Sequence, residues 1–433
     1  MAEPRSRPLQ VAAPCAGGIT AHQLAALNRL IAEIAPRNRF YETKLRAAGG
    51  LGGFRSLDEF RERMPFTTKQ ELVSDQAAHP PFGTLLTYAP ATYTRFHQTS
   101  GTSGRPLVWL DDPTSWQWVI GNWKRVWESA GATAGDAAFF AFSFGPFLGF
   151  WAAFDSALQC GVRAIPAGGL GSAERLSFLL AQRPRFLCCT PTYALRLAEV
   201  AHRESISLAA SGVERILVAG EPGGSIPQVR LAIERAWPGA RVIDHHGMTE
   251  VGPVSCGDEG PEPRLHPFHE SYLCEVVHPG TGDPVPIGQG RGELVLTTLG
   301  RAGSPLFRYR TGDLVEPIAP DAGDPAAFLL RGGILGRSDD MVIVRGVNLY
   351  PAAVDAAVRT FGGIREYRVE VDRRGTMPQV TMLIDADEHG RDLCPGLARH
   401  LHAVFQLRIE VRAALPGSLP AFEMKARRWT FLG

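Results

Sequence analysis

The sequence predicts the α/β fold class, with a large N-terminal part of mainly parallel sheets flanked by helices and a smaller α/β segment after it. Three observations predict this. Short apolar runs alternate with helical segments in the middle of the chain, β character dominates from about Leu273, and a second strand–helix segment starts past Gly336. Such alternation is typical of crossover units on a buried parallel sheet. At 433 residues the chain exceeds the size at which one core stops growing, so at least two domains are expected.

The N-terminal elements are assigned from hydrophobic periodicity. Residues 21–48 have the spacing of one or two amphipathic helices, and residues 115–130 place apolar side chains on one helical face. Residues 137–154 carry no charge and have nearly the length of a membrane-spanning helix, but a proline and two glycines interrupt them. We therefore expect a buried strand, a turn and the start of a helix there.

The remaining elements are predicted from apolar runs and from the turn-forming residues between them. Alternating strands and helices of the middle region are expected at residues 185–190, 193–203, 215–220, 227–236 and 241–244. A β-rich part follows, with strands at 275–277 and 292–298. The last segment is expected to hold a hairpin at 341–347, strands near 367–371 and 379–384, a helix near 397–407 and a final strand near 409–412. We place the boundary between the two parts at residues 336–340.

The composition narrows the classes of function. The chain has 45 basic and 44 acidic residues, and this balance argues against a general binder of nucleic acids or anionic membranes. Its seven cysteines are sparse and lack the spacing of a disulfide framework, which suits a reducing compartment. No secretory signal is visible at the start. We expect a cytoplasmic protein with neither a nucleic acid nor a membrane as a partner.

A glycine-rich, hydroxyl-rich stretch is the strongest single motif. Glycine allows the main chain to approach an anion closely, and hydroxyls with successive backbone N–H groups wrap a polyphosphate. The common ATPase loop needs a lysine after its last glycine, and here Arg105 and Pro106 follow. The predicted phosphate-binding residues are Thr99, Ser100, Gly101, Thr102, Ser103 and Gly104.

Further polar clusters follow predicted strands, where ligands bind in open α/β sheets. They comprise Gly220-Glu221-Pro222, His245-His246-Gly247-Met248-Thr249-Glu250, residues 308–313, residues 336–340 and residues 419–427. Taken singly each is weak, since a turn aspartate or a surface lysine explains most of them.

As an ordered set, these motifs resemble the adenylate-forming superfamily of acyl- and aryl-CoA ligases, adenylation domains and luciferases. The order is TSGTSGRP, GEP, HGMTE, YRTGD, GRSDD and a lone lysine near the C-terminus. GRSDDMVIVRGVNLYP and the short length resemble the phenylacetate–CoA ligase branch most closely. The resemblance implies an adenylation domain at residues 1–336, a hinge at 337–340 and a small mobile domain at 341–433.

The resemblance implies two half-reactions. A carboxylate attacks the α-phosphorus of ATP to give an acyl-adenylate and pyrophosphate, and a thiol, that of coenzyme A, then displaces AMP. In this scheme Glu250 binds Mg²⁺, a hard cation that prefers carboxylates and phosphate oxygens. Thr249 contacts the α-phosphate, Asp313 accepts both ribose hydroxyls, Gly220 and Glu221 flank the adenine, and His246 stacks on it. His246 departs from relatives, which usually carry tyrosine.

The resemblance also assigns residues near the C-terminus. Lys425 is the adenylation catalyst, whose ammonium bridges the attacking carboxylate and the α-phosphate. Arg337 contacts ribose or phosphate, and Asp339 is the hinge. The rotation of the C-terminal domain then brings in the turn that accepts pantetheine, formed by Val344, Arg345 and Gly346.

An aromatic segment is expected to line the acid pocket, because flat walls suit a ring slotted between side chains. Its residues are Phe142, Phe144, Phe147, Phe150 and Trp151. We therefore expect an aryl or arylacetic acid rather than a long fatty acid.

A zinc site is a further hypothesis, because cysteine and histidine both suit zinc. The four residues concerned fall within nineteen positions and are Cys256, His266, His269 and Cys274.

Three functions stay open at this point. The first is an ATP-dependent aryl–CoA ligase. The second is a stand-alone enzyme that loads an aryl acid onto the phosphopantetheine of a carrier protein. The third is a non-catalytic nucleotide-binding relative, which the joint presence of Lys425, Glu250 and Asp313 disfavours. The natural acid and the oligomeric state, a homodimer included, are left open.

Overall fold

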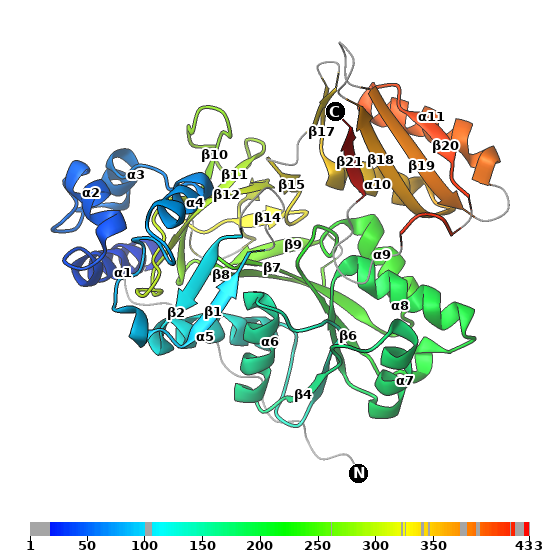
Figure 1. Cartoon of the computed structure of the whole chain (residues 1–433), viewed down its shortest axis with the longest axis horizontal. Helices are drawn as coiled ribbons and strands as arrows, with labels where there is room; N and C mark the ends of the chain where they lie inside the picture. Colours follow the sequence, from blue (N-terminus) through cyan, green and yellow to red (C-terminus); the bar gives the residue numbers. More distant parts are fainter. Residues whose placement is uncertain are drawn as a thin grey trace.

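The computed structural model shows two lobes, a large one formed by most of the chain and a small one formed by its last elements (Figure 1). It describes residues 18–99, 106–260, 262–321, 324, 326–338, 342–344, 347–372, 379–386, 390–415, 417–420 and 428–432.

A nine-stranded sheet is the centre of the large lobe. Its spatial order is β13-β14-β9-β8-β7-β6-β5-β3-β4. Five neighbouring strands are parallel, namely β4 (Arg163–Pro166), β3 (Ala137–Phe140), β5 (Phe186–Cys189), β6 (Arg215–Val218) and β7 (Arg241–Met248). The other four continue the sheet in antiparallel pairing and are β8 (Gly252–Gly257), β9 (Arg264–Pro267), β14 (Leu329–Arg331) and β13 (Pro317–Ile318).

Helices cover both faces of the parallel part, which explains why its strands are apolar throughout. On one face, Trp127 of α5 (Pro113–Ser129) packs on Phe140 and Phe186, beside α6 (Leu148–Gln159). On the other face lie α7 (Ser172–Gln182), α8 (Pro191–Arg203) and α9 (Pro227–Ala236), where Phe139 stacks edge-on against Phe178 of α7. Successive residues of each strand therefore pack alternately into the two cores on either face of the sheet.

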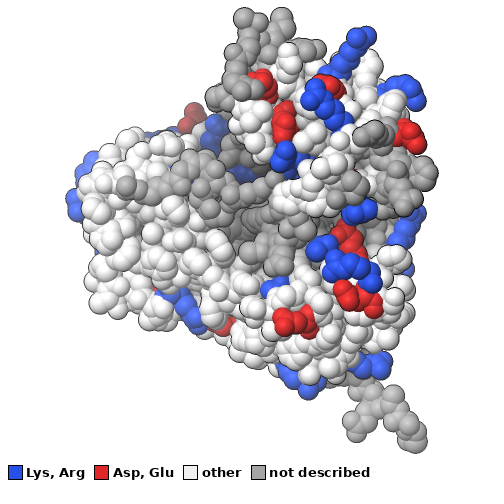
Figure 2. All heavy atoms as spheres, turned by 45° about the vertical axis from the view of Figure 1, so that its right-hand side comes forward, with Lys and Arg blue, Asp and Glu red and all other residues white. Residues whose placement is uncertain are grey.

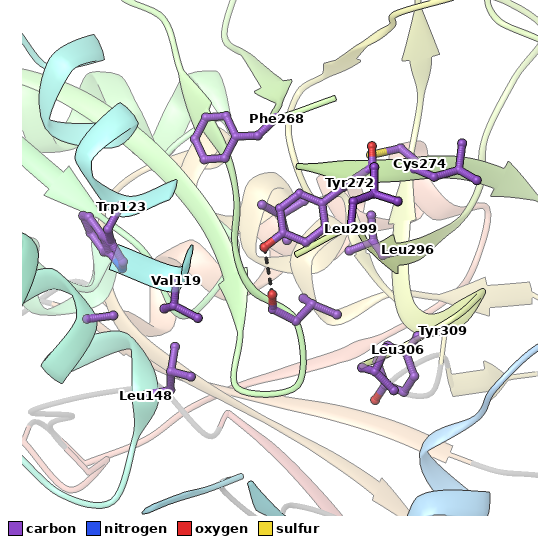
Figure 3. Close-up of a cluster of buried hydrophobic side chains, with 14 of the residues drawn as sticks. Val119, Trp123, Leu148, Phe268, Tyr272, Cys274, Leu296, Leu299, Leu306 and Tyr309 are labelled. Atoms are coloured by element: carbon purple, nitrogen blue, oxygen red, sulfur yellow. Dashed lines mark hydrogen bonds between the residues drawn. The ribbon is translucent and has the colours of Figure 1, made fainter. Parts of the chain in front are cut away.

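A second, antiparallel sheet completes the large lobe. Its order is β10 (Tyr272–Val277), β11 (Gly292–Thr298), β12 (Tyr309–Val315) and β15 (Gly336–Arg337). Tyr272 reaches from this sheet into the core of α5, where its hydroxyl donates to the carbonyl of Val251 at 2.8 Å (Figure 3). This bond ties the second sheet to the turn that follows β7.

Short elements near the N-terminus pack around the second sheet. They are α1 (Gly18–Ile34), α2 (Arg39–Ala47), α3 (Leu57–Arg63), α4 (Lys69–Ala78), the 3₁₀ turn η1 (Pro90–Thr92) and the hairpin β1 (Arg95–Gln98) with β2 (Val108–Asp111). A second 3₁₀ turn, η2 (Leu208–Ala210), precedes β6.

The small lobe has its own sheet and its own apolar core. It starts with the hairpin β16 (Val342–Val344) and β17 (Val347–Leu349) and continues with α10 (Pro351–Phe361), β18 (Ile364–Asp372), β19 (Gln379–Ala386), α11 (Gly390–Phe405), β20 (Glu410–Ala413) and β21 (Trp429–Leu432). The strand order is β20-β19-β18-β21.

The predicted fold class is confirmed, and most predicted elements are present. Residues 21–48 form the two helices α1 and α2, and residues 137–154 form β3, a loop and the start of α6. Among the described residues, no helix is long and apolar enough to cross a membrane.

One predicted strand end was wrong, because the strand expected at 241–244 continues to Met248, where its polar residues pair with β8. The strand expected near 409–412 is present as β20, but it is not the final strand, since β21 follows it.

Candidate active site

Asp313 lies at the centre of the candidate nucleotide site, with a basic side chain on each of its carboxylate oxygens. The His246 Nε2 is 2.9 Å from Oδ2, and an Arg337 guanidinium N–H donates to Oδ1 at 3.1 Å. Asp313 and Arg337 are partners in the β12–β15 register, so the backbone holds them together. Asp313 is buried, and a carboxylate with two oxygens is the type of group that the predicted contact with two ribose hydroxyls requires.

His246 therefore has a defined orientation. Because a carboxylate only accepts, the proton of this bond is on Nε2. The Nδ1 is buried, and it has no hydrogen-bond partner among the residues that the structure describes. The predicted stacking on adenine thus uses the face of the His246 ring, while the edge of the ring is hydrogen-bonded to Asp313.

Glu250 lies in the turn between β7 and β8 and is almost fully buried. The Tyr309 hydroxyl donates to Glu250 Oε1 at 3.3 Å, and the Lys69 Nζ lies 3.5 Å from the same oxygen. A buried carboxylate needs a cation or donors. Lys69, at the start of α4, supplies positive charge at the place where the resemblance puts Mg²⁺. The sequence offered no signal for Lys69, and it placed Tyr309 in a motif without a role. A bridge between Thr67 and Tyr309 brings the two residues together from distant parts of the chain.

A fully buried ion pair holds the backbone of the Glu250 turn in place. Arg301 binds both oxygens of Asp111, each at 2.6 Å, and neither side chain is exposed. The same guanidinium donates to the backbone carbonyls of Thr249 and Glu250 at 3.0 and 2.9 Å. Burial raises the pKa of Asp111, but the combined effect of Arg301 and His97 holds the pKa below its ordinary value. Neither residue belongs to a motif, so the sequence offered no signal for this pair.

The base of the glycine-rich loop is closed by backbone pairing. Thr99 accepts from the Leu107 N–H through its hydroxyl and donates its own N–H to the Leu107 carbonyl, both at 3.0 Å. His97, two residues earlier, stacks on Trp116 of α5 with ring centroids 5.2 Å apart. The other predicted loop residues, 100–104, lie outside the described residues.

The GEP cluster follows β6 at the carboxyl edge of the sheet. Gly220 has a left-handed φ of +92°, which a side chain would disfavour. Glu221 accepts the Thr192 N–H, at the start of α8, at 2.8 Å. The neighbouring Asp244, at the end of the same sheet row, is half-buried, and the loss of solvent around its carboxylate raises its pKa although Ser225 hydrogen-bonds to it.

The aromatic segment forms one connected cluster between β3 and α6. Phe142 and Phe150 stack with centroids 4.1 Å apart, Phe144 tilts against Trp151 at 4.9 Å, and Phe147 meets Phe150 edge-on at 5.9 Å. The Gln98 N–H donates to the Pro146 carbonyl at 2.7 Å, so this segment adjoins the strand that leads into the glycine-rich loop. Trp151 is the most exposed of the five, with 37% of its surface accessible.

His245 points away from its neighbour His246, to the face of α5. Its Nδ1 lies 2.8 Å from the Ser255 carbonyl, and its ring is 4.4 Å from that of Trp123. Burial lowers the pKa of His245 to about 4, although the bond to Ser255 opposes this. The side chain is therefore neutral near pH 7.

The zinc hypothesis is wrong for the described residues, none of which form a group of three or more metal ligands. Cys256 and His266 are cross-strand partners, but His266 bonds to Asp258 at 3.0 Å and His269 to the Phe328 carbonyl at 2.9 Å. Cys274 is buried in β10, where burial raises its thiol pKa. These residues have structural partners of their own.

Several predicted residues of the small lobe cannot be placed. Asp339, Arg345, Gly346 and Lys425 lie outside the described residues. Val344 is buried in β16. The surface of the molecule is hollowed where the two lobes meet (Figure 2).

Comparison with known proteins places this site in a family. Residues 97–301 match the AMP-binding enzyme family, and residues 346–430 match the AMP-binding enzyme C-terminal domain. A phenylacetate–coenzyme A ligase of Thermus thermophilus is 32% identical over 86% of this chain and 82% of its own length. One from Escherichia coli is 31% identical over 90% of this chain and 89% of its own.

Solved structures give the same result. The 2-hydroxyisobutyryl-CoA ligase in the postadenylation state, in complex with 2-HIB-AMP, matches 94% of this chain and 88% of its own with a TM-score of 0.87 at 29% identity. The same enzyme with 2-HIB-AMP and CoA in the thioesterification state matches 99% of this chain and 96% of its own with a TM-score of 0.70 at 28% identity. The lobes of this chain are thus arranged more like the postadenylation state.

Fold and site together define an adenylate-forming enzyme. The chain belongs to the phenylacetate–coenzyme A ligase family of AMP-binding enzymes, and it is accordingly an AMP-forming acid–coenzyme A ligase.

Proposed function

We propose that this chain activates an aromatic carboxylic acid with ATP and Mg²⁺ as an acyl-AMP and transfers the acyl group to coenzyme A. One observation carries the proposal: β12 holds both Asp313, whose carboxylate is bound by His246 and Arg337, and Tyr309, whose hydroxyl donates to the buried Glu250. A carboxylate placed for ribose beside a carboxylate placed for a metal is the pair that an ATP-consuming adenylation needs.

The proposed roles follow the chemistry of each side chain. Glu250 binds the Mg²⁺ of Mg·ATP, and Lys69 balances its charge before the nucleotide arrives, because an unpaired buried carboxylate is costly. Thr249 and the glycine-rich loop contact the phosphates, while Gly220 and Glu221 flank the adenine. Lys425 stabilises the negative charge that develops when the acid attacks the α-phosphorus.

The proposed domain division is residues 1–336 and 341–433, joined by a hinge at 337–340 with Asp339. The pairing of the strands supports it, since β15 still belongs to the large lobe and β16 and later strands pair within the small lobe. The hinge lets the small lobe deliver Lys425 for adenylation and the turn of Val344, Arg345 and Gly346 for thioester formation.

The aromatic cluster supports an aromatic acid as the substrate. Phe142 and Phe150 stack face to face, and Phe147 and Trp151 extend the same apolar wall. The names of the phenylacetate–coenzyme A ligase relatives agree with an aryl acid. The six described cysteines are free thiols, which supports the expected cytoplasmic location.

A pyrophosphate-release screen of carboxylic acids, with and without coenzyme A, tests the proposal. Aromatic acids are expected to trigger release, and coenzyme A is expected to turn a single burst into steady turnover with formation of the thioester. Activity with medium or long aliphatic acids alone would contradict the aromatic assignment. ATP binding without release for any acid would support a non-catalytic protein instead.

Lys425→Ala tests the catalytic assignment. Acid-dependent pyrophosphate release is expected to fall at least about 100-fold, because removing one preorganised charge or donor costs on the order of 3 kcal/mol of transition-state stabilisation. Thioester formation from a supplied acyl-adenylate is expected to persist. Lys124→Ala, on the surface of α5, is the matched control. Unchanged pyrophosphate release in Lys425→Ala would refute the role.

A further inference from the structure

The register of the parallel sheet places His245 opposite the aromatic cluster. Phe140, Cys188, Leu217 and Ile243 are cross-strand partners in one row, and all four face the core under α5 and α6. Phe142 lies two residues beyond the first member of this row, and His245 lies two residues beyond the last. Side chains two residues apart share a face, so Phe142 and His245 point to the same side of the sheet.

Three strand spacings separate these two side chains. At about 4.8 Å each, their backbones lie about 14 Å apart, and the side chains of Phe142 and His245 border the space between them from opposite sides. The corresponding positions of the two strands between them carry the smaller Thr190 and Ala219. Phe142 is backed by Phe150, and His245 is backed by Trp123.

Figure 3 extends this arrangement to α6. Trp123 and Val119 of α5 lie beside Leu148, the first residue of α6, which directly follows Phe147. The helix whose Trp123 contacts His245 therefore packs beside the start of the helix that carries Phe150.

The hydrogen bond of His245 defines which nitrogen faces this space. A backbone carbonyl only accepts, so the Nδ1 must donate to Ser255 and carry the proton. In the neutral ring, Nε2 is then a lone-pair acceptor, and no described residue donates to it. The depressed pKa, a consequence of burial, keeps this ring neutral over the whole physiological range.

We propose that His245 determines specificity by accepting, through Nε2, a hydrogen bond from the acid, so that the preferred substrates are aromatic acids with a hydroxyl or amino donor on the ring. The inference rests on the proposed function and names its substrate class more narrowly. A buried acceptor left unpaired costs free energy, so an acid without the donor binds less well at this position.

Matched acid pairs test the inference in the full-length wild-type protein. Acid-dependent pyrophosphate release is measured with phenylacetate and benzoate and with the ortho, meta and para hydroxyl and amino derivatives of each. At least one derivative is expected to exceed its parent roughly 10- to 100-fold in kcat/KM. Equal or higher kcat/KM for every unsubstituted parent would overturn the inference, since water would then satisfy Nε2. Release with no acid at all would instead count against the proposed function.

His245→Leu and His245→Gln identify the acceptor. The preference for the donor-bearing acid is expected to fall to about onefold in His245→Leu and to persist in part in His245→Gln, whose side-chain carbonyl accepts. The KM for ATP serves as the internal control for the nucleotide site. His202→Leu, an exposed histidine on α8, is expected to keep the wild-type preference. If His245→Leu does not fold, the His245→Gln result and the wild-type ratios decide, and a preference that survives in His245→Leu overturns the assignment.

Discussion

Removing either member of the Asp111–Arg301 pair is expected to destabilise the protein strongly. Both side chains are fully buried, and Arg301 makes two charged bonds to Asp111 and two to the backbone of the Glu250 turn. Arg301→Met leaves a carboxylate buried without its cation. A lost partner of this kind costs about 3–5 kcal/mol.

The surface pair Arg46–Glu42 is the matched control. Its nitrogen–oxygen distance is 2.8 Å, close to the 2.6 Å of the buried pair, but its side chains are 66% and 50% exposed. Exposed pairs contribute about 0–1 kcal/mol, so Arg46→Met is expected to change little. The contrast separates burial from distance as the source of the effect.

Denaturant unfolding followed by tryptophan fluorescence measures the change, because the Arg301 guanidinium lies 5.3 Å from the ring of Trp109. A cycle with Asp111→Leu, Arg301→Met and the double variant gives the coupling energy, and the double variant is expected to lose less than the sum of the singles. A loss in Arg301→Met no larger than in Arg46→Met would refute the reasoning.

Two further predictions concern the metal and the pH. Glu250→Gln is expected to raise the Mg²⁺ concentration for half-maximal pyrophosphate release at least about tenfold, because a neutral amide is a weaker ligand for a hard cation, whereas the exposed Glu262→Gln is expected to leave it unchanged. Acidification is expected to lower the free energy of unfolding between about pH 6.5 and pH 4. In this pH range His245 binds a proton in the unfolded state but not in the folded state, where its pKa is about 4. This difference lowers the free energy of unfolding by up to about 3 kcal/mol. Urea unfolding at several pH values measures this effect. The slope of the unfolding free energy against pH is expected to be flatter in His245→Leu than in the wild type. A His245→Leu slope equal to that of the wild type would assign the acid sensitivity to other groups.

The candidate site could be predicted from the sequence where its residues lie in local motifs. Glu250 and Asp313 each stand beside a glycine or threonine in a short polar cluster that follows or begins a strand, and such clusters are visible in a linear chain. Lys69, Asp111 and Arg301 belong to no cluster, and Tyr309 stands in a motif without any signal that its hydroxyl meets Glu250. They reach the site through pairing between elements that are far apart in the sequence, such as the bridge of Thr67 to Tyr309.

The strand β7 shows the same division within one element. The sequence predicts its apolar half, but it places the polar residues from His245 to Met248 after the end of the strand, because they lack an apolar pattern. The pairing of His245 and His246 with Cys256 and Ser255 of β8 makes it a strand. That pairing also sends the two neighbouring histidines to opposite faces, one toward Asp313 and one toward Trp123.

By itself the sequence determined the α/β class, most helices and strands and the order of the nucleotide motifs, because periodicity and turn chemistry are local properties. Only the tertiary structure decided which charges are paired, which histidine nitrogen is protonated and that the cysteine–histidine group is no metal site. Those properties depend on burial and on partners from other elements, as far as 190 residues away, and no local pattern encodes them.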